Sequence, residues 1–265
     1  MPGHSENKLL TPNFPTPEKI NRDILEHGFA IYHDVITKEC ISELRRFWCN
    51  EFKWQNVKGK VVRGDLRIGE PNYLTYTDSK FWCLYRQFDF LWNPPTHDIT
   101  TRLGIEVHKI RNQAQGFDSE YGLTYVPDRY GIYMSTSWYQ PNQGHLESHI
   151  DGHKDTPILQ YMLPITQKGN DFDGGGLFVK IGEGPKIDVD ELMKSGSIVF
   201  FDARNHHGVD KITCSDPMMK GRIATFAIPT FFRGQDEVPA SLRKAQDIYY
   251  WFKRKLIYFH KASDS

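Results

Sequence analysis

The sequence predicts a mainly β protein with flanking helices, in which the strands form a double-sheet jelly roll or barrel. Two observations support this prediction. After residue 130, short apolar runs alternate with Gly-, Asn- and Pro-rich turns about every ten residues, as in antiparallel β folds. Before that point, apolar residues recur at the three-to-four-residue spacing of amphipathic helices. The predicted strands of the core are Ile132–Tyr139, Leu146–Asp151, Pro157–Leu163, Leu177–Ile181, Ser197–Asp202, Val209–Ile212 and Arg222–Pro229.

The N-terminal region carries clear helix signals. Residues 1–15 are expected to form a loose arm, because they show no periodic pattern. Thr16 is a suitable N-cap for a helix that ends at Gly28. A short strand, Phe29–Tyr32, is expected next, and Thr37 then caps a second helix.

Farther along, residues 54–78 are expected to be irregular, and two helices are predicted over Lys80–Trp92 and Thr96–Gln113. A last helix is predicted over residues 239–260. No linker or repeat divides the chain, so one domain spanning residues 1–265 is expected. It comprises a helical N-terminal region that includes a substrate lid (16–122), the β core (130–230) and the C-terminal helix.

The bulk composition excludes several classes of function. With 39% hydrophobic and 25% charged residues among 265, the chain has the profile of an ordinary globular protein. Lys plus Arg equals Asp plus Glu at 33 each, so no basic excess indicates a nucleic-acid or membrane surface. The four cysteines match no zinc or disulfide pattern, and no signal peptide or membrane-spanning run is visible. We therefore expect a cytoplasmic protein without nucleic-acid or membrane partners.

The segment from Gln143 to His153 contains a metal-binding pattern. Residues two apart in a strand point to the same face, so His149 and Asp151 would direct an imidazole and a carboxylate to one point. A third ligand must come from a neighbouring strand, and the adjacent pair His206 and His207 supplies it. Two histidines and one carboxylate with open adjacent positions are typical of non-haem iron(II) oxygenases.

Other sets of histidines fit a metal site less well. His145 and His149 are four residues apart, as in a helical zinc motif, but the order HLESH differs from HExxH and nearby Pro and Gly disfavour a helix. His153 would share the face of His149 only if the strand continued through Gly152, where a turn is expected. Of His206 and His207, only one can point inward from a strand.

Four segments of the chain resemble the iron(II)/2-oxoglutarate-dependent oxygenase superfamily, and within it the phytanoyl-CoA-hydroxylase-like branch. The segment 28–48 is similar to that branch's first strand and helix, and His149–Asp151 to the family's His-x-Asp. Residues 171–179 resemble its glycine-marked strand, and residues 196–212 resemble the strand that bears the distal histidine. The family's His-x-Val continuation selects His207 over His206.

The resemblance implies a double-stranded β-helix (jelly-roll) core that binds Fe(II), 2-oxoglutarate and O2. The metal ligands, which are also the catalytic residues, would be His149, Asp151 and His207. Arg222 would bind the far carboxylate of 2-oxoglutarate through its planar fork, and Thr225 would add a hydroxyl.

The implied function is a dioxygenase that oxidises a C–H bond of a small molecule and releases succinate and CO2. Asp151 favours oxygen chemistry over halogenation, because halogenating relatives replace this carboxylate with a small residue. Hydroxylation is expected first, with desaturation, cyclisation or epoxidation as other outcomes, in specialised biosynthesis. A cupin-like dioxygenase or isomerase without 2-oxoglutarate and a non-catalytic jelly-roll binding module are the alternatives. The chain is expected to be a monomer or homodimer.

Overall fold

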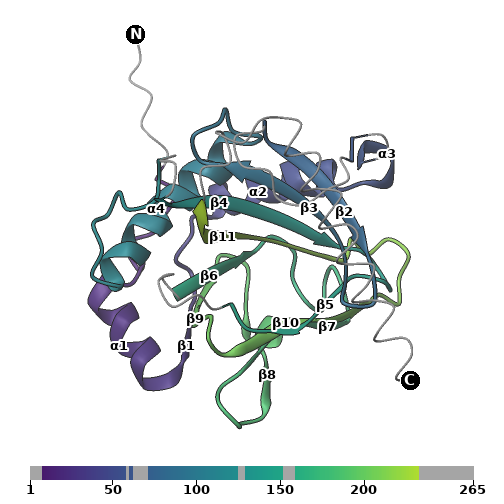
Figure 1. The fold of residues 1–265 in the computed structure, drawn as a ribbon. Helices are drawn as coiled ribbons and strands as arrows, with labels where there is room; N and C mark the ends of the chain where they lie inside the picture. Colours follow the sequence, from purple (N-terminus) through teal and green to yellow (C-terminus); the bar gives the residue numbers. More distant parts are fainter. Residues whose placement is uncertain (1–7, 58–59, 62–70, 125–128, 152–158, 233–265) are drawn as a thin grey trace, which may run out of the picture.

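The computed structural model describes residues 8–57, 60–61, 71–124, 129–151 and 159–232, and shows a curled antiparallel sheet with helices packed outside it (Figure 1). The sheet runs in the order β1-β9-β6-β11-β4-β3-β5-β10-β7-β8, and β2 pairs with β3. This architecture confirms the prediction of a mainly β jelly roll with flanking helices. The strands are β1 Phe29–Tyr32, β2 Tyr73–Asp78, β3 Trp82–Phe90, β4 Arg129–Tyr139, β5 His145–His149, β6 Leu159–Pro164, β7 Gly174–Lys180, β8 Lys186–Asp188, β9 Ile198–Asp202, β10 His206–Thr213 and β11 Arg222–Phe232.

The first two helices begin where the sequence signals place them. The Thr16 side chain accepts a hydrogen bond from the Lys19 amide at the start of the first helix, and Thr37 accepts one from the Cys40 amide at the start of the second. Each cap satisfies a backbone donor that the first turn leaves without a partner. The helices are α1 Pro17–His27, α2 Lys38–Glu51, α3 Trp54–Val57, α4 Asp98–Ala114 and α5 Val189–Leu192.

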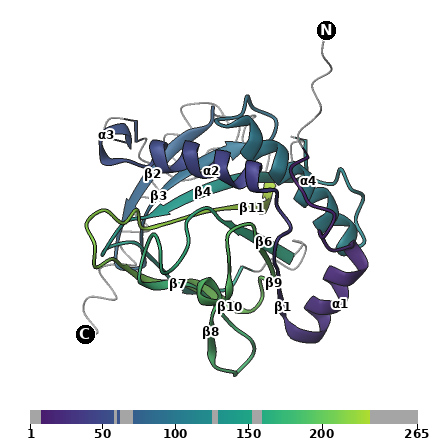
Figure 2. The same ribbon diagram turned by 180° about the vertical axis from the view of Figure 1, so that it is seen from behind.

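The sheet folds into two layers, and α2 and α4 cover the outer face of one of them. In Figures 1 and 2, α2 and α4 lie over the layer that contains β2, β3, β4 and β11, while β5, β7 and β10 lie on the opposite side. Leu44 and Trp48 of α2 and Leu103 and Val107 of α4 pack in one cluster with Ile132 of β4, all at most 1% exposed. Since side chains alternate along a strand, the other face of β4 is left to line the space between the layers.

The predicted helix over Lys80–Trp92 is wrong, because these residues form β3. The segment from Trp82 to Phe90 is rich in aromatic residues and pairs with both β2 and β4. Strands that are buried on both faces lose the polar alternation by which strands are recognised, so their apolar residues also fit a helical spacing. Residues 73–78, expected to be irregular, form the neighbouring strand β2.

The N-terminal segment packs against the sheet and helices. Of the expected N-terminal arm, residues 8–15 pack on the body: Leu9 is 3% exposed, and the Thr11 amide donates to the carbonyl of Val35. The predicted helix over 239–260 lies outside the described residues. No helix in the described part of the chain is both long and apolar enough to span a bilayer.

Candidate metal centre

Strand pairing brings the two inward histidines together. His149 at the end of β5 and His207 near the start of β10 are direct partners in the antiparallel register. Opposite residues on one face of such a pair have Cβ atoms about 5 Å apart, which places both rings over one point. Gly208 keeps β10 close to β5, because a Cβ added there would lie 2.6 Å from the carbonyl oxygen of Leu146.

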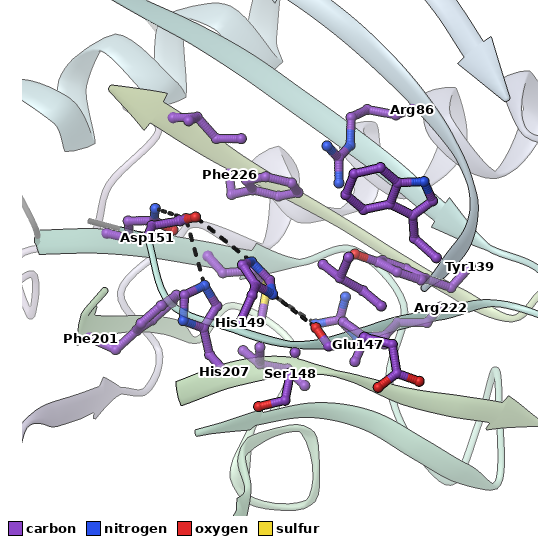
Figure 3. Close-up of a pocket in the computed structure, with 18 of the residues that line it drawn as sticks. Arg86, Tyr139, Glu147, Ser148, His149, Asp151, Phe201, His207, Arg222 and Phe226 are labelled. Atoms are coloured by element: carbon purple, nitrogen blue, oxygen red, sulfur yellow. Dashed lines mark hydrogen bonds and ion pairs between the residues drawn. The ribbon is translucent and has the colours of Figure 1, made fainter. Parts of the chain in front are cut away.

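Asp151 follows the end of β5 and completes the set (Figure 3). Its amide donates to the carbonyl of Ala203 at 2.9 Å, which fixes the chain as it leaves the strand. Ile150, between His149 and Asp151, is 53% exposed and points away, so the expected two-residue alternation persists past the strand. One ligand atom from each of His149, Asp151 and His207 lies within 4.8 Å of the others.

The distances fit a single ion. His149 Nε2 is 3.8 Å from Asp151 Oδ1, and His207 Nε2 is 3.7 Å from Asp151 Oδ2. Two donors that each lie about 2 Å from one ion can be no more than about 4 Å apart. Both measured separations fall inside this limit, so small side-chain movements suffice to bind a metal here.

Backbone carbonyls set the tautomer of both imidazoles. The Nδ1 atom of His149 is 2.9 Å from the carbonyl oxygen of Glu147, and that of His207 is 3.0 Å from the carbonyl oxygen of Asn205. A carbonyl only accepts hydrogen bonds, so each Nδ1 carries the proton and donates it. The Nε2 lone pairs are therefore directed at Asp151, as required of metal-binding imidazoles.

The electrostatics favour the metal-binding protonation states. Burial lowers the pKa of His149, and the neighbouring charge of His207 lowers it further, so this imidazole is neutral near pH 7. Burial by itself would raise the pKa of Asp151, but its interactions with His207 and His149 and a hydrogen bond from Gln160 outweigh burial and lower it. The Gln160 amide donates to Asp151 Oδ2 at 2.6 Å and so orients the carboxylate.

The other histidines are outside this set. His206 is exposed and its Nδ1 lies 3.4 Å from the Ser148 hydroxyl, so His207 is the inward member of the pair. His145 lies on strand β5, with its ring nitrogens near the carbonyls of Gln143 and Lys80, which excludes the helical zinc motif. His153 lies outside the described residues.

A cavity of about 400 Å³ opens beside the three side chains. Its walls are mostly apolar, and its polar groups converge on a few positions, which is the usual composition of a small-molecule site. Trp82 of β3 lines this cavity. The walls include Trp82, Arg86, Tyr133, Tyr139, Leu146, Glu147, Tyr161, Met162, Leu177, Phe201, Val209, Arg222, Phe226 and Ile228.

Arg222 lines the cavity and is held by a buried ion pair. Its Nε donates to Asp190 Oδ2 at 2.6 Å and its Nη2 to Asp190 Oδ1 at 3.3 Å. The two side chains are only 3% and 4% exposed. The guanidinium also lies over the ring of Tyr139, with Cζ 5.4 Å from the ring centroid. Nη1 takes no part in the bonds to Asp190, and Nη2 also lies 3.6 Å from Met162 Sδ.

Thr225 is not brought together with the other predicted site residues. Arg222 and Phe226 are an even number of residues apart on β11 and both line the cavity, whereas Thr225 is an odd number from each and points to the opposite face. Its hydroxyl is 2.7 Å from that of Thr136 and donates to the carbonyl of Ser135. The geometry therefore does not support the predicted contact between Thr225 and 2-oxoglutarate.

Three residues at or behind the cavity wall were missed by sequence reasoning. Gln160 bonds to Asp151 from another strand, and Asp190 bonds to Arg222, 32 residues away; no local sequence pattern reports such pairs. Arg86 lies within the segment predicted as a helix, and recognition of β3 would have placed it on the same face of a strand as Phe88.

Comparison with known proteins identifies the fold. Neither a protein-family model nor a curated protein matches the chain. A prolyl-4-hydroxylase from Pseudomonas putida matches with a TM-score of 0.54 at 15% identity, over 83% of this chain and 100% of that one. AviO1 from Streptomyces viridochromogenes gives 0.52 at 12% identity, over 83% and 96%. A Trichoplax adhaerens prolyl hydroxylase, solved with a hypoxia inducible factor peptide fragment, gives 0.51 at 12% identity, over 81% and 89%.

The chain has the double-stranded β-helix fold of these hydroxylases. The predicted double-stranded β-helix is thereby confirmed. At 15% identity or less, these solved structures are like this chain in fold alone. The resemblance to the phytanoyl-CoA-hydroxylase-like branch stays a prediction.

Proposed function

We propose that this protein is an iron(II)- and 2-oxoglutarate-dependent dioxygenase that oxidises a C–H bond of a small molecule. The observation that carries the proposal is the set of His149, Asp151 and His207, whose donor atoms lie within 4.8 Å of one another beside a cavity. Two imidazoles and one carboxylate suit a redox-active iron, and they occupy only part of its coordination sphere. The fold shared with known enzymes of this chemistry supports the same assignment.

Different residues of this chain would bind the metal, orient its ligands and position the substrate. His149, Asp151 and His207 would hold the metal, while Gln160 and two backbone carbonyls keep these side chains in their binding orientations. Bound iron and 2-oxoglutarate would supply the activation of O2 for C–H oxidation, with succinate and CO2 as co-products. The apolar walls of the cavity would exclude water and position one C–H bond of the substrate.

Arg222 would bind the far carboxylate of 2-oxoglutarate. Its Nη1 edge is not used by Asp190, and a planar guanidinium binds a carboxylate through two parallel hydrogen bonds. Asp190 would hold the side chain in place, so little rotamer freedom is lost on binding. Hydroxylation is the expected outcome, and desaturation, cyclisation and epoxidation are further outcomes of the same C–H chemistry.

The test is an anaerobic titration of the purified protein with iron(II) and then 2-oxoglutarate, recorded as a visible difference spectrum. Chelation of the metal by 2-oxoglutarate should produce a weak charge-transfer band. We expect His149→Ala to remove the band, and Arg222→Met to shift the titration to higher 2-oxoglutarate concentration. Arg45→Met is the matched control, because Arg45 pairs with Asp171 outside the cavity.

Each contrary result would point to a different function. Iron binding without a 2-oxoglutarate band would contradict the co-substrate and favour a cupin-like metal enzyme. No iron binding at all would contradict the metal centre and leave a non-catalytic binding module. If Arg222→Met and Arg45→Met required the same 2-oxoglutarate concentration to form the band, only the proposed role of Arg222 would be contradicted.

A further inference from the structure

Two arginines of the described chain line the cavity, and of these only Arg222 has an ion-pair partner among the described residues. Arg222 is neutralised by Asp190 at 2.6 Å. Arg86 has no carboxylate within ion-pair distance among the described residues, and neither Glu147 nor Asp151, which also line the cavity, contacts it. A cation on an apolar wall without an anionic partner is costly unless a ligand compensates it.

The surroundings of Arg86 hold it in place without neutralising it. On β3 it lies opposite Ser137 of β4, and its Nε donates to the Ser137 hydroxyl at 3.3 Å. Its Cζ lies 5.9 Å from the ring centroid of Phe88 and 5.6 Å from that of Phe226. A guanidinium has five N–H donors, and the bond to Ser137 uses only the Nε donor. Among the described residues, neither Nη group of Arg86 has a hydrogen-bond partner, so both can donate to a ligand.

The two arginines serve different parts of the cavity. Arg222 lies over Tyr139, whereas Arg86 lies over Phe226, and Figure 3 shows the two side chains entering from different strands. In the sheet, Arg86 aligns with Ser137 and hence with Ala224, so it is offset from Arg222 both along β11 and by the width of β4. Two anionic groups can therefore be bound separately.

We propose that Arg86 binds a carboxylate of the primary substrate, which is then a small organic acid with an apolar body. This inference rests on the proposed function, in which Arg222 is engaged by 2-oxoglutarate. The planar Nη edge of Arg86 matches a carboxylate, and the aromatic rings beside it lower the local dielectric and strengthen the pairing. The apolar body would lie against Trp82, Phe226 and Ile228 of the same cavity.

The test compares two probes of nearly equal shape, phenylacetate and its neutral amide phenylacetamide. Their binding is measured by calorimetry on full-length protein loaded with zinc, which is redox-inert, and saturated with 2-oxoglutarate. The wild type should prefer phenylacetate by about tenfold or more, since charge-assisted hydrogen bonds exceed neutral ones by at least that factor. Arg86→Met should bring the ratio close to one, and Arg86→Lys should retain part of it.

The controls separate the two sources of carboxylate. Arg86→Met should bind 2-oxoglutarate as the wild type does when no probe is present, whereas Arg222→Met should not. Arg46→Met, which removes an exposed arginine of α2, should leave the phenylacetate preference unchanged. Retained 2-oxoglutarate binding by Arg86→Met also demonstrates that this variant is folded.

Several results would overturn the proposal. These are equal binding of the two probes by the wild type, no phenylacetate binding, or an unchanged preference in Arg86→Met. A loss of 2-oxoglutarate affinity in Arg86→Met would assign Arg86 to the co-substrate instead. If zinc-loaded wild type binds no 2-oxoglutarate, the proposed function fails; the probe comparison on the zinc-loaded protein alone then still decides whether Arg86 recognises a carboxylate.

Discussion

Replacing Asp190 with asparagine should leave Arg222 as a buried cation without a partner. The pair is bidentate, at 2.6 and 3.3 Å, and its side chains are 3% and 4% exposed. Breaking a buried pair by removing one partner costs about 3–5 kcal/mol, whereas exposed pairs contribute about 0–1 kcal/mol. Asparagine preserves the shape and can still accept the hydrogen bond from the Leu177 amide, so the loss reports the charge.

A double-mutant cycle measures this coupling. We expect Asp190→Asn and Arg222→Met each to lower the free energy of unfolding by about 3–5 kcal/mol in urea titrations of the metal-free protein. The double variant should be less destabilised than either single one, because it leaves no uncompensated charge. Single-variant losses below about 1 kcal/mol, or losses that simply add, would refute the reasoning.

The same variants connect stability with the co-substrate. In Asp190→Asn, an anion bound at Arg222 would replace the missing charge, so saturating 2-oxoglutarate should raise the melting temperature of the metal-loaded variant more than that of the wild type. Thermal unfolding with and without 2-oxoglutarate checks this. An equal shift in both proteins would mean that the anion does not contact Arg222.

Three further predictions concern the metal centre and the backbone. His207→Ala should weaken Mn(II) binding at least about tenfold, as expected for loss of a ligand, while His206→Ala should leave it unchanged; calorimetry distinguishes them. Metal affinity should stay constant near pH 7 and decrease only below the usual imidazole pKa of about 6.5, because the lowered pKa of His149 keeps this ring neutral above that pH. A decrease in metal affinity that begins above about pH 6.5 would contradict this prediction. Gly175→Ala should cost well over 1 kcal/mol in urea titrations, because φ is +76° and the new Cβ would lie 2.1 Å from the carbonyl oxygen of Lys211, whereas Gly169→Ala, with φ +82° and open space around it, should cost only about 1 kcal/mol.

The sequence is most informative where a rule of strand geometry applies within a few residues. His149 and Asp151 can be placed on one face because side chains alternate every two residues, and this alternation persists beyond β5. The same rule counts against Thr225, whose odd separation from Arg222 sends it to the opposite face. Whether two residues on a strand are separated by an even or an odd number of positions therefore tests the pairing of Asp151 with His149 and of Thr225 with Arg222.

Features that depend on pairing between distant segments could not be predicted. The register of His207 opposite His149 needs the β5–β10 ladder, and the bond between Arg222 and Asp190 joins two separate elements. The error over β3 has a different cause, because this strand is buried on both faces and its apolar residues do not alternate strictly with polar ones. Arg86 was overlooked for that reason.

The close approach of β10 to β5 at Gly208 means that a residue without a side-chain metal ligand sets the spacing of the candidate metal centre. A larger side chain there would meet the carbonyls of Leu146 and Glu147 and push apart the two strands that carry His149 and His207. Such a change keeps all three metal ligands and still alters the distance between His149 and His207. Natural or laboratory variants with weakened metal affinity should therefore be sought in the main-chain spacing of β5 and β10 as well as among the ligands.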